Sequence, residues 1–148
     1  MASDLTSMMT PLRKSVYALR NGVIADTLRK GGLPHTYIFG LQLPQLKQLS
    51  EEYRPSDDKE AAELARALWA DRDCRETRLM ACHLMPPAEM ETEEALAWAR
   101  DTRSREESDI LAFRLLRRHR AAAEIEKELA ASDDERVRYS AEALRRFL

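Results

Sequence analysis

Residues 104–119 (SREESDILAFRLLRRH) constrain the fold most, because they predict a helix that is apolar on nearly all sides. Ser104 followed three residues later by Glu107 forms a capping box, which is typical of a helix start. Within residues 110–116 only Arg114 is not apolar. A helix of this kind is covered on most sides by other elements. We therefore expect it at the middle of the fold.

One acid of this stretch, Asp109, lies in register with the apolar residues Ala112, Phe113 and Leu116. The spacing i, i+3, i+4, i+7 places all four on one helix face. A carboxylate on an apolar face needs a partner when it is buried. Asp109 is therefore either a paired core acid or part of a functional site, and the residues alone leave both hypotheses open.

The N-terminal part predicts a flexible arm over residues 1–9, followed by a helix. Thr10 as a cap and Pro11 at the first helical position would begin this helix, and the pair Gly31-Gly32 would end it. The residues expected to form its buried stripe are Leu12, Val16, Leu19 and Val23.

The connector over residues 33–42 is too apolar for a free loop, so we expect it to pack onto the helices. Gly40 is the position where a positive φ would allow a kink. Beyond it, three further capping boxes predict helix starts. They are Asp57 with Glu60, Asp73 with Glu76, and Ser132 with Glu135.

In total the sequence predicts an all-α protein of about eight helices, with a single domain over residues 10–148. Taken in antiparallel pairs, the helices recur every 30–40 residues or so, as in HEAT and armadillo repeats. We expect a HEAT-like, armadillo-type right-handed superhelix, and the alternative is a closed helical bundle. Trp69 and Trp98 lie at core spacing and are expected to be buried.

Composition excludes several classes of protein. The net charge is −2, so nucleic-acid binding would require charge that is segregated onto one face. Cys74 and Cys82 would lie about 12 Å apart on a helix, too far for a disulfide, and free thiols suit a reducing cytoplasm. No apolar run approaches the ~18–20 residues of a membrane span. We expect a cytoplasmic protein without membrane contact, metal or cofactor.

Basic residues gather at the end of the predicted helix over residues 104–119 and in the last predicted helix. The first cluster is Arg114, Arg117, Arg118 and Arg120, and the second is Arg136, Arg138, Arg145 and Arg146. If both helices line one groove, these cations can bind phosphates. Alternatively, cations simply stabilise helix C-termini. That explanation suits Arg117, Arg118, Arg145 and Arg146, whereas Arg136 and Arg138 lie in a first helical turn, where a cation opposes the dipole.

Two segments resemble the HEAT-like alkylpurine DNA glycosylases, the AlkD-like DNA alkylation repair family. In residues 37–54 the resemblance lies in Gly40, Pro44, Leu46, Lys47 and the pair Glu52-Tyr53. In residues 68–85 it lies in Leu68, Trp69, Glu76, Arg78, Leu79 and Ala81. The resemblance covers residues 10–145 or so.

The resemblance implies a superhelix whose positive concave face holds duplex DNA, and excision of cationic alkylated bases with a carboxylate. Asp109 matches the second acid of the family's Trp-Asp-x-x-Asp motif, and Arg105 stands at its tryptophan. In the Trp-Leu-x-Arg-x-Ala motif, Arg136 stands at the tryptophan, and Tyr139 stands at the arginine, next to Arg138.

Two functional hypotheses follow. The first is a DNA-binding protein of the alkylation repair type; if active, it is a DNA glycosylase that uses Asp109 to release alkylated purines. The alternative is a non-catalytic scaffold for a protein partner, including a structural domain of a larger repair complex. The predicted DNA-binding residues are Arg105, Arg114, Arg117, Arg118, Arg136, Arg138 and Tyr139.

Overall fold

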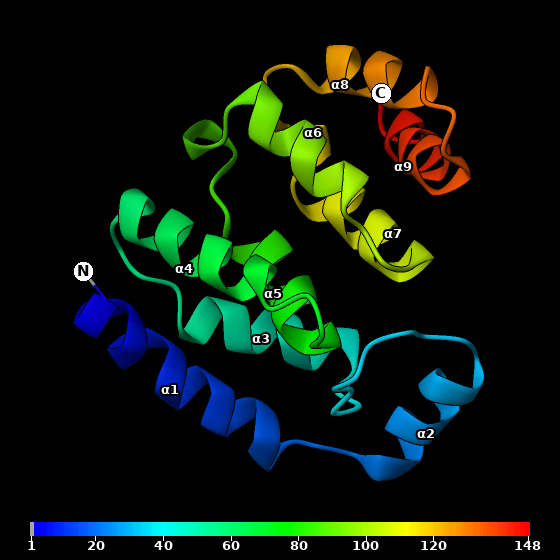
Figure 1. The fold of residues 1–148 in the computed structure, drawn as a ribbon. Helices are drawn as coiled ribbons and strands as arrows, with labels where there is room; N and C mark the ends of the chain where they lie inside the picture. The colour runs from blue at the N-terminus through cyan, green and yellow to red at the C-terminus, as the bar shows by residue number, and fades with distance from the viewer. Residues whose placement is uncertain (1) are drawn as a thin grey trace. The chain divides into compact units, whose positions relative to one another are not determined.

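The computed structural model describes residues 2–148, with side chains from residue 4 onward, and every regular element in this part is a helix (Figure 1). The exception is one isolated β-bridge between Tyr37 and Cys74. The predicted all-α fold is confirmed. None of the helices in this part of the chain is both long and apolar enough to cross a membrane.

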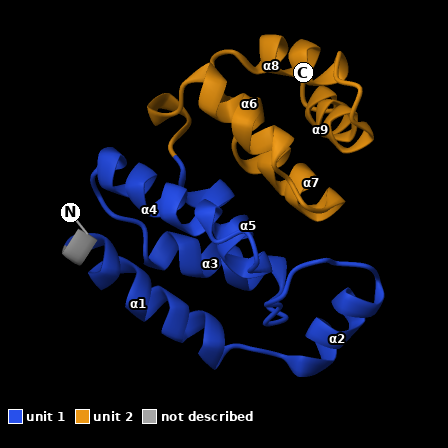
Figure 2. Cartoon of the chain, viewed as in Figure 1, with its two compact units in different colours: residues 1–85 blue, residues 86–148 orange. Residues whose placement is uncertain are grey.

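The chain divides into two compact units, residues 1–85 and 86–148 (Figure 2). The range that we predicted as one domain therefore contains a boundary after Met85. The first unit holds α1 (Ala2–Ala18), α2 (Gly22–Lys30), α3 (Leu43–Glu52), α4 (Asp58–Ala70) and α5 (Arg75–Leu84). The second holds η1 (Pro87–Glu89), α6 (Thr92–Arg100), α7 (Arg105–Arg114), η2 (Leu116–Arg118), α8 (Ala122–Ala130) and α9 (Glu135–Arg145).

Helix α1 begins earlier than the sequence predicted. Residues 2–9, expected as an arm, belong to α1, and Pro11 lies inside the helix; Met1 is outside the described residues. The reason is that the apolar stripe extends toward the N-terminus. Leu5 and Met8 are half-buried, in register with the buried Leu12, so the first turns also gain from packing.

The predicted first helix is in fact two helices, because the chain turns between α1 and α2. The Asn21 side chain caps α2 and accepts hydrogen bonds from the amides of Val23 and Ile24, both at 3.1 Å. Its own amide donates to the carbonyl of Phe39 at 2.7 Å. Leu19 and Val23 were expected to be buried and are instead 41% and 77% exposed.

The first unit is organised around the fully buried carboxylate of Glu76 on α5. It accepts hydrogen bonds from the amides of Phe39 and Gly40 at 3.0 Å and of Leu41 at 3.4 Å. The neighbouring Arg75 donates to the same carboxylate and to the Leu41 carbonyl, both at 2.8 Å. The connector is therefore bound to α5, and the predicted helix cap of Asp73 with Glu76 is wrong.

Gly40 has the predicted positive φ, at 84°. A Cβ atom at this position would lie 2.2 Å from the Asn21 carbonyl oxygen and 2.8 Å from the Ala25 amide nitrogen. The backbone of the connector therefore passes so close to the start of α2 that no side chain fits.

In the second unit α7 packs against α9, α8 against α9, and α6 against α8. Helix α7 begins as predicted, since the Ser104 hydroxyl accepts a hydrogen bond from the Glu107 amide at 3.0 Å. The Glu107 carboxylate bonds to the Arg103 amide at 2.9 Å. The helix ends at Arg114, and the rest of residues 104–119 continues as η2.

The two tryptophans are buried as predicted, with exposed fractions of 6% for Trp69 and 5% for Trp98. The guanidinium of the buried Arg78 lies over the Trp69 ring, 3.8 Å from the ring centroid. Cys74 and Cys82 are buried free cysteines. Burial is the main cause that raises the pKa of the Cys74 thiol, which keeps this thiol protonated and unreactive.

Replacing Gly40 with alanine should destabilise the protein by at least about 2 kcal/mol, because the methyl group meets backbone atoms at a positive φ. The matched control is Gly22→Ala, where a Cβ atom meets nothing within 4 Å. There the helical alanine should instead stabilise by about 0.4–1 kcal/mol. Urea unfolding of both variants measures the difference, and equal stabilities would contradict the close approach at Gly40.

Replacing Glu76 with glutamine should cost about 3–5 kcal/mol, because the charge of Arg75 stays buried without its counterion. The control is Glu51→Gln, which removes an exposed ion pair with Lys47 at 3.1 Å. An exposed i,i+4 pair contributes only about 0.3–0.5 kcal/mol. If chemical unfolding ranks the two variants as equal, Glu76 does not hold the connector.

Candidate functional site on helices α7 and α9

One surface of the second unit brings together three of the predicted site residues, Arg105, Asp109 and Tyr139. Arg105, Asp109 and Phe113 follow each other at four-residue spacing, which places them on one face of α7. Side chains from α9 and the residues after it contact this row. We call this surface the α7–α9 face and define it by Arg105, Asp109, Phe113, Tyr139, Arg146 and Phe147.

Asp109 lies at the middle of the α7–α9 face. The Tyr139 hydroxyl donates a hydrogen bond of 2.7 Å to its Oδ1 atom, and Arg146 Nη1 lies 3.8 Å from the same oxygen. The Asp109 side chain is nevertheless 43% exposed. The carboxylate is thus paired, as one hypothesis required, and also accessible to a ligand.

The hydrogen bond between Tyr139 and Asp109 acts on the phenol. The pKa of Tyr139 is raised, first by burial and then by this bond to the carboxylate, because both disfavour the phenolate. The guanidinium of Arg105 lies 4.7 Å from the centroid of the Tyr139 ring, and that of Arg146 lies 5.9 Å from it. Tyr139 therefore fixes one carboxylate and two cations at once.

Beside Tyr139 there is a hollow of about 290 Å³. Its lining residues are Arg105, Glu135, Arg136 and Tyr139. The Nη1 atom of Arg136 is buried and has no hydrogen-bond partner among the described residues. This cation lies in the first turn of α9, where it opposes the helix dipole. Its placement is therefore not explained by helix stability.

Beyond Asp109, the α7–α9 face is aromatic. The rings of Phe113 and Phe147 lie 5.5 Å apart between centroids. The guanidinium of Arg117 lies 4.5 Å from the first centroid and 5.4 Å from the second. Arg114 also lies over Phe113, at 4.8 Å. Cations and aromatic rings therefore alternate along this surface.

Other predicted arginines bind backbone carbonyls near helix ends. Arg118 donates to the Arg114 carbonyl at 3.5 Å, and Arg117 donates through Nε to the Phe113 carbonyl at 2.7 Å. Arg138 donates to the Ser132 carbonyl at 3.0 Å. These bonds match the alternative role of cations at helix C-termini for Arg117 and Arg118. Arg117 alone of the three also contacts the rings of the α7–α9 face.

Buried hydroxyl groups join the helices beneath the α7–α9 face. Ser140 of α9 donates to Ser108 of α7 at 2.9 Å, and Ser108 donates to Thr102 at 3.1 Å. All three residues are buried. Because the bond between Ser140 and Ser108 requires these two oxygen atoms to lie close together, it helps to set the register of α7 against α9 and hence the position of Asp109 relative to Tyr139.

Arg146 and Phe147 were missing from the predicted site residues. The sequence shows Arg145 and Arg146 as neighbouring cations, and only the structure separates their roles. Arg145 pairs with Glu126 at 3.1 Å, whereas Arg146 turns toward Asp109. No periodicity signals this difference, because both residues lie where α9 ends.

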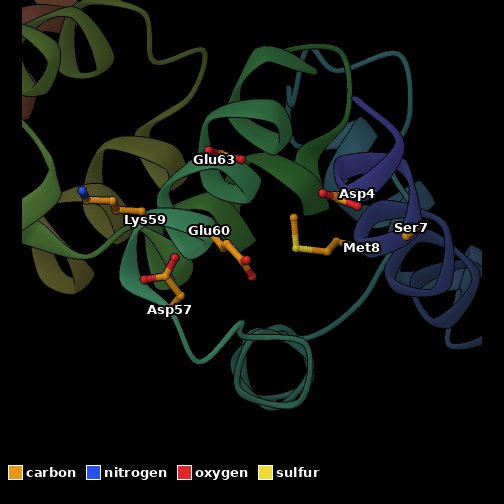
Figure 3. Close-up of a pocket in the computed structure, with 7 residues that line it drawn as sticks. All are labelled: Asp4, Ser7, Met8, Asp57, Lys59, Glu60 and Glu63. Carbon is orange, nitrogen blue, oxygen red and sulfur yellow. The ribbon is translucent and has the colours of Figure 1, made fainter. Parts of the chain in front are cut away.

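A larger hollow, of about 640 Å³, lies between α1 and α4 in the first unit (Figure 3). Its lining residues are Asp4, Ser7, Met8, Asp57, Lys59, Glu60 and Glu63. Several of these acids belong to helix starts, where carboxylates stabilise the dipole. Within the described residues, no three His, Cys, Asp or Glu side chains are placed to hold a metal ion. The acidic hollow is therefore not the candidate site.

Comparison with known proteins gives one match that covers most of the chain. The family described as DNA alkylation repair enzyme matches residues 12–143. Searches of individual curated proteins and of solved structures gave no match.

Spectrophotometric titration should show Tyr139 ionising above the usual tyrosine pKa of about 10. Because folding raises this pKa, the protonated phenol stabilises the folded protein. This contribution is complete below about pH 10 and is lost as the pH rises through the pKa of the folded state. Asp109→Asn should lower the pKa of Tyr139 toward its usual value, since the charged acceptor is removed. The Tyr139→Phe variant shows which part of the titration belongs to Tyr139. An unchanged Tyr139 titration in Asp109→Asn would rule out that Asp109 raises the pKa of Tyr139.

Proposed function

Because the chain belongs to the DNA alkylation repair enzyme family, we propose that it binds duplex DNA through the α7–α9 face. The observation that supports this most is the local excess of cations. Arg146 lies beside the exposed Asp109, and Arg105 and Arg136 line the hollow beside Tyr139 together with Glu135. Arg117 lies further along, over the Phe147 ring. A local positive surface attracts phosphates although the net charge of the chain is −2.

The contacts of Asp109 give it a second role in this proposal. Tyr139 and Arg146 both act on Oδ1, and the side chain stays accessible. A carboxylate held in this way can stabilise the positive charge that develops on the sugar when a glycosidic bond breaks. Base release from an alkylated purine, where it occurs, is therefore assigned to Asp109.

The replacements at the family's tryptophan positions also fit phosphate binding. Arg105 lies over the Tyr139 ring and lines the hollow, and Arg136 brings a buried guanidinium nitrogen without a partner to the same hollow. A guanidinium presents several N–H donors that match phosphate oxygens. We assign Arg105 and Arg136 to phosphate contacts and not to contact with an extruded base.

The decisive test is the affinity for duplex DNA across a salt series, measured by fluorescence anisotropy. Arg105→Ala and Arg136→Ala should each reduce the slope of log affinity against log salt by about 1. The control is Lys127→Ala, which removes an exposed cation of the same unit from α8 and should leave the slope unchanged. Absence of salt-dependent binding at about 50 mM salt would exclude the proposal.

Base release is tested separately, with a duplex that contains a methylated purine. Asp109→Asn should reduce the rate at least about 100-fold if the carboxylate stabilises the transition state, while binding to unmodified duplex stays intact. Equal rates in both proteins would remove Asp109 from the chemistry.

One observation favours a second candidate function, a non-catalytic scaffold. The Oδ1 atom of Asp109 is already occupied by Tyr139, and Phe147 and Leu148 are 40% and 57% exposed. Exposed apolar residues at the edge of a cationic surface are also suited to a protein partner. Binding of a protein partner by a chain that fails the salt test would favour this function.

A further inference from the structure

The basic residues of the first unit are segregated along the chain. Residues 5–50 contain six cations and one acid, Asp26, which gives a net charge of +5 for this segment. The six cations are Arg13, Lys14, Arg20, Arg29, Lys30 and Lys47. Since the whole chain has a net charge of −2, the remaining residues carry −7. With the terminal acids Asp4, Glu51 and Glu52 included, the whole segment from α1 to α3 has a net charge of +2, and the rest of the chain carries −4. This segment is therefore the part of the unit that attracts a polyanion.

Two adjoining hollows lie at this basic segment, with volumes of about 250 and 350 Å³. Arg13, Phe39 and Cys74 line both of them, Tyr17 lines the first and Tyr37 the second. We call them together the aromatic hollow. Tyr17 and Tyr37 are 55% and 58% exposed. Exposed aromatic rings around a concave surface are a common element of binding sites.

The hollow is held by a contact between two of its rings and by hydrogen bonds of the connector backbone. Tyr17 and Phe39 make an edge contact, with centroids 6.3 Å apart and an angle of 77° between the rings. The Phe39 amide is bound by Glu76 at 3.0 Å. The Tyr37 amide donates to the Asp73 carbonyl at 2.8 Å. A preformed site of this kind loses little entropy when a ligand binds.

The polar groups beside the rings suit a nucleotide. Arg13 and Asp71 form an ion pair of 3.1 Å, with side chains 48% and 28% exposed, and both line the hollow. Together they offer donors and an acceptor to the edge of a base. The guanidinium of Arg20 lies over the Tyr17 ring, 3.9 Å from its centroid. It therefore covers one face of this ring and places a cation next to a base that stacks on the other face or on Tyr37.

We infer that the aromatic hollow holds an unpaired nucleobase of single-stranded DNA, stacked on Tyr37 or on the face of Tyr17 that Arg20 does not cover, with a flanking phosphate on Arg20. Aromatic rings beside cations are the usual means of binding single strands. A base inside a duplex cannot enter the hollow, because its faces are already stacked. This site is separate from the α7–α9 face and uses none of its residues.

An apolar protein partner is the competing occupant, since Leu19 and Val23 are also exposed nearby in the sequence. The net charge of the segment decides between single-stranded DNA and a protein partner. The positive net charge from α1 to α3 favours a polyanion, whereas a protein interface is depleted of charged residues at its centre.

The test uses a short single-stranded oligodeoxynucleotide with one 2-aminopurine, and the same oligonucleotide in a duplex. The full-length protein should quench the fluorescence of the single strand and quench the duplex much less. Tyr17→Ala and Tyr37→Ala should each weaken single-strand binding about 5-fold or more, the effect of one lost stacking contact. Tyr17→Phe keeps the ring and should bind like the wild-type protein.

Controls separate this site from the proposed function. Arg105→Ala should lose duplex affinity while its quenching of the single strand stays unchanged, so the two sites can fail independently. Glu63→Gln changes an exposed charge elsewhere in the same unit, and should have no effect. Thermal melting verifies that each tyrosine variant is folded.

Two results would overturn the inference. One is single-strand binding that neither tyrosine variant weakens. The other is self-association or protein binding that Tyr17→Ala abolishes while no oligonucleotide is quenched, which would make the aromatic hollow a protein interface.

Discussion

The structure of the first unit depends on one buried charge, the carboxylate of Glu76. The connector between α2 and α3, residues 31–42, carries amides that water would normally satisfy. Here Glu76 satisfies those of Phe39, Gly40 and Leu41, and Arg75 balances its charge. Apolar connector residues can therefore be buried at low cost. Breaking this arrangement would leave both a charge and several amides without partners.

Asp109, in the second unit, has a contrasting environment. Asp109 accepts a hydrogen bond from a side chain and is also exposed to solvent, whereas Glu76 is fully enclosed. The difference comes from what lies around each acid. Glu76 faces backbone amides on a rigid connector, and Asp109 faces the tips of long side chains, Tyr139 and Arg146. Long side chains can move aside for a ligand, and backbone amides cannot.

The net charge of −2 conceals two cationic surfaces. One is the α7–α9 face, where arginines contact aromatic rings and a carboxylate. The other is the basic segment around the aromatic hollow. Each combines guanidinium groups with rings, as in nucleic-acid binding surfaces. Family membership over residues 12–143 is consistent with the first. The second follows from the local charge and geometry alone.

The helices and the family could be predicted from the sequence, because both are carried by local patterns. Periodicity and capping residues predicted a helix over residues 104–119, and its cap at Ser104 and its first ten residues are confirmed as α7. The positive φ at Gly40 required a glycine. Motif spacing also places Asp109, Arg105, Arg136 and Tyr139 on two helix starts, and their role in a site stays a prediction. The break at Asn21 was missed, although the pair Asn21-Gly22 is a turn signal.

The remaining features were decided by tertiary structure, because they join residues that are far apart in the chain. Glu76 was interpreted as a local cap, and its real partners lie more than thirty residues earlier. Arg146 was indistinguishable from Arg145 until α9 packed on α7 and placed it beside Asp109. The sequence determined which residues form each helix face, since that depends on a repeat of 3.6 residues. Which faces meet depends on packing, and packing set the contacts of Glu76 and Asp109.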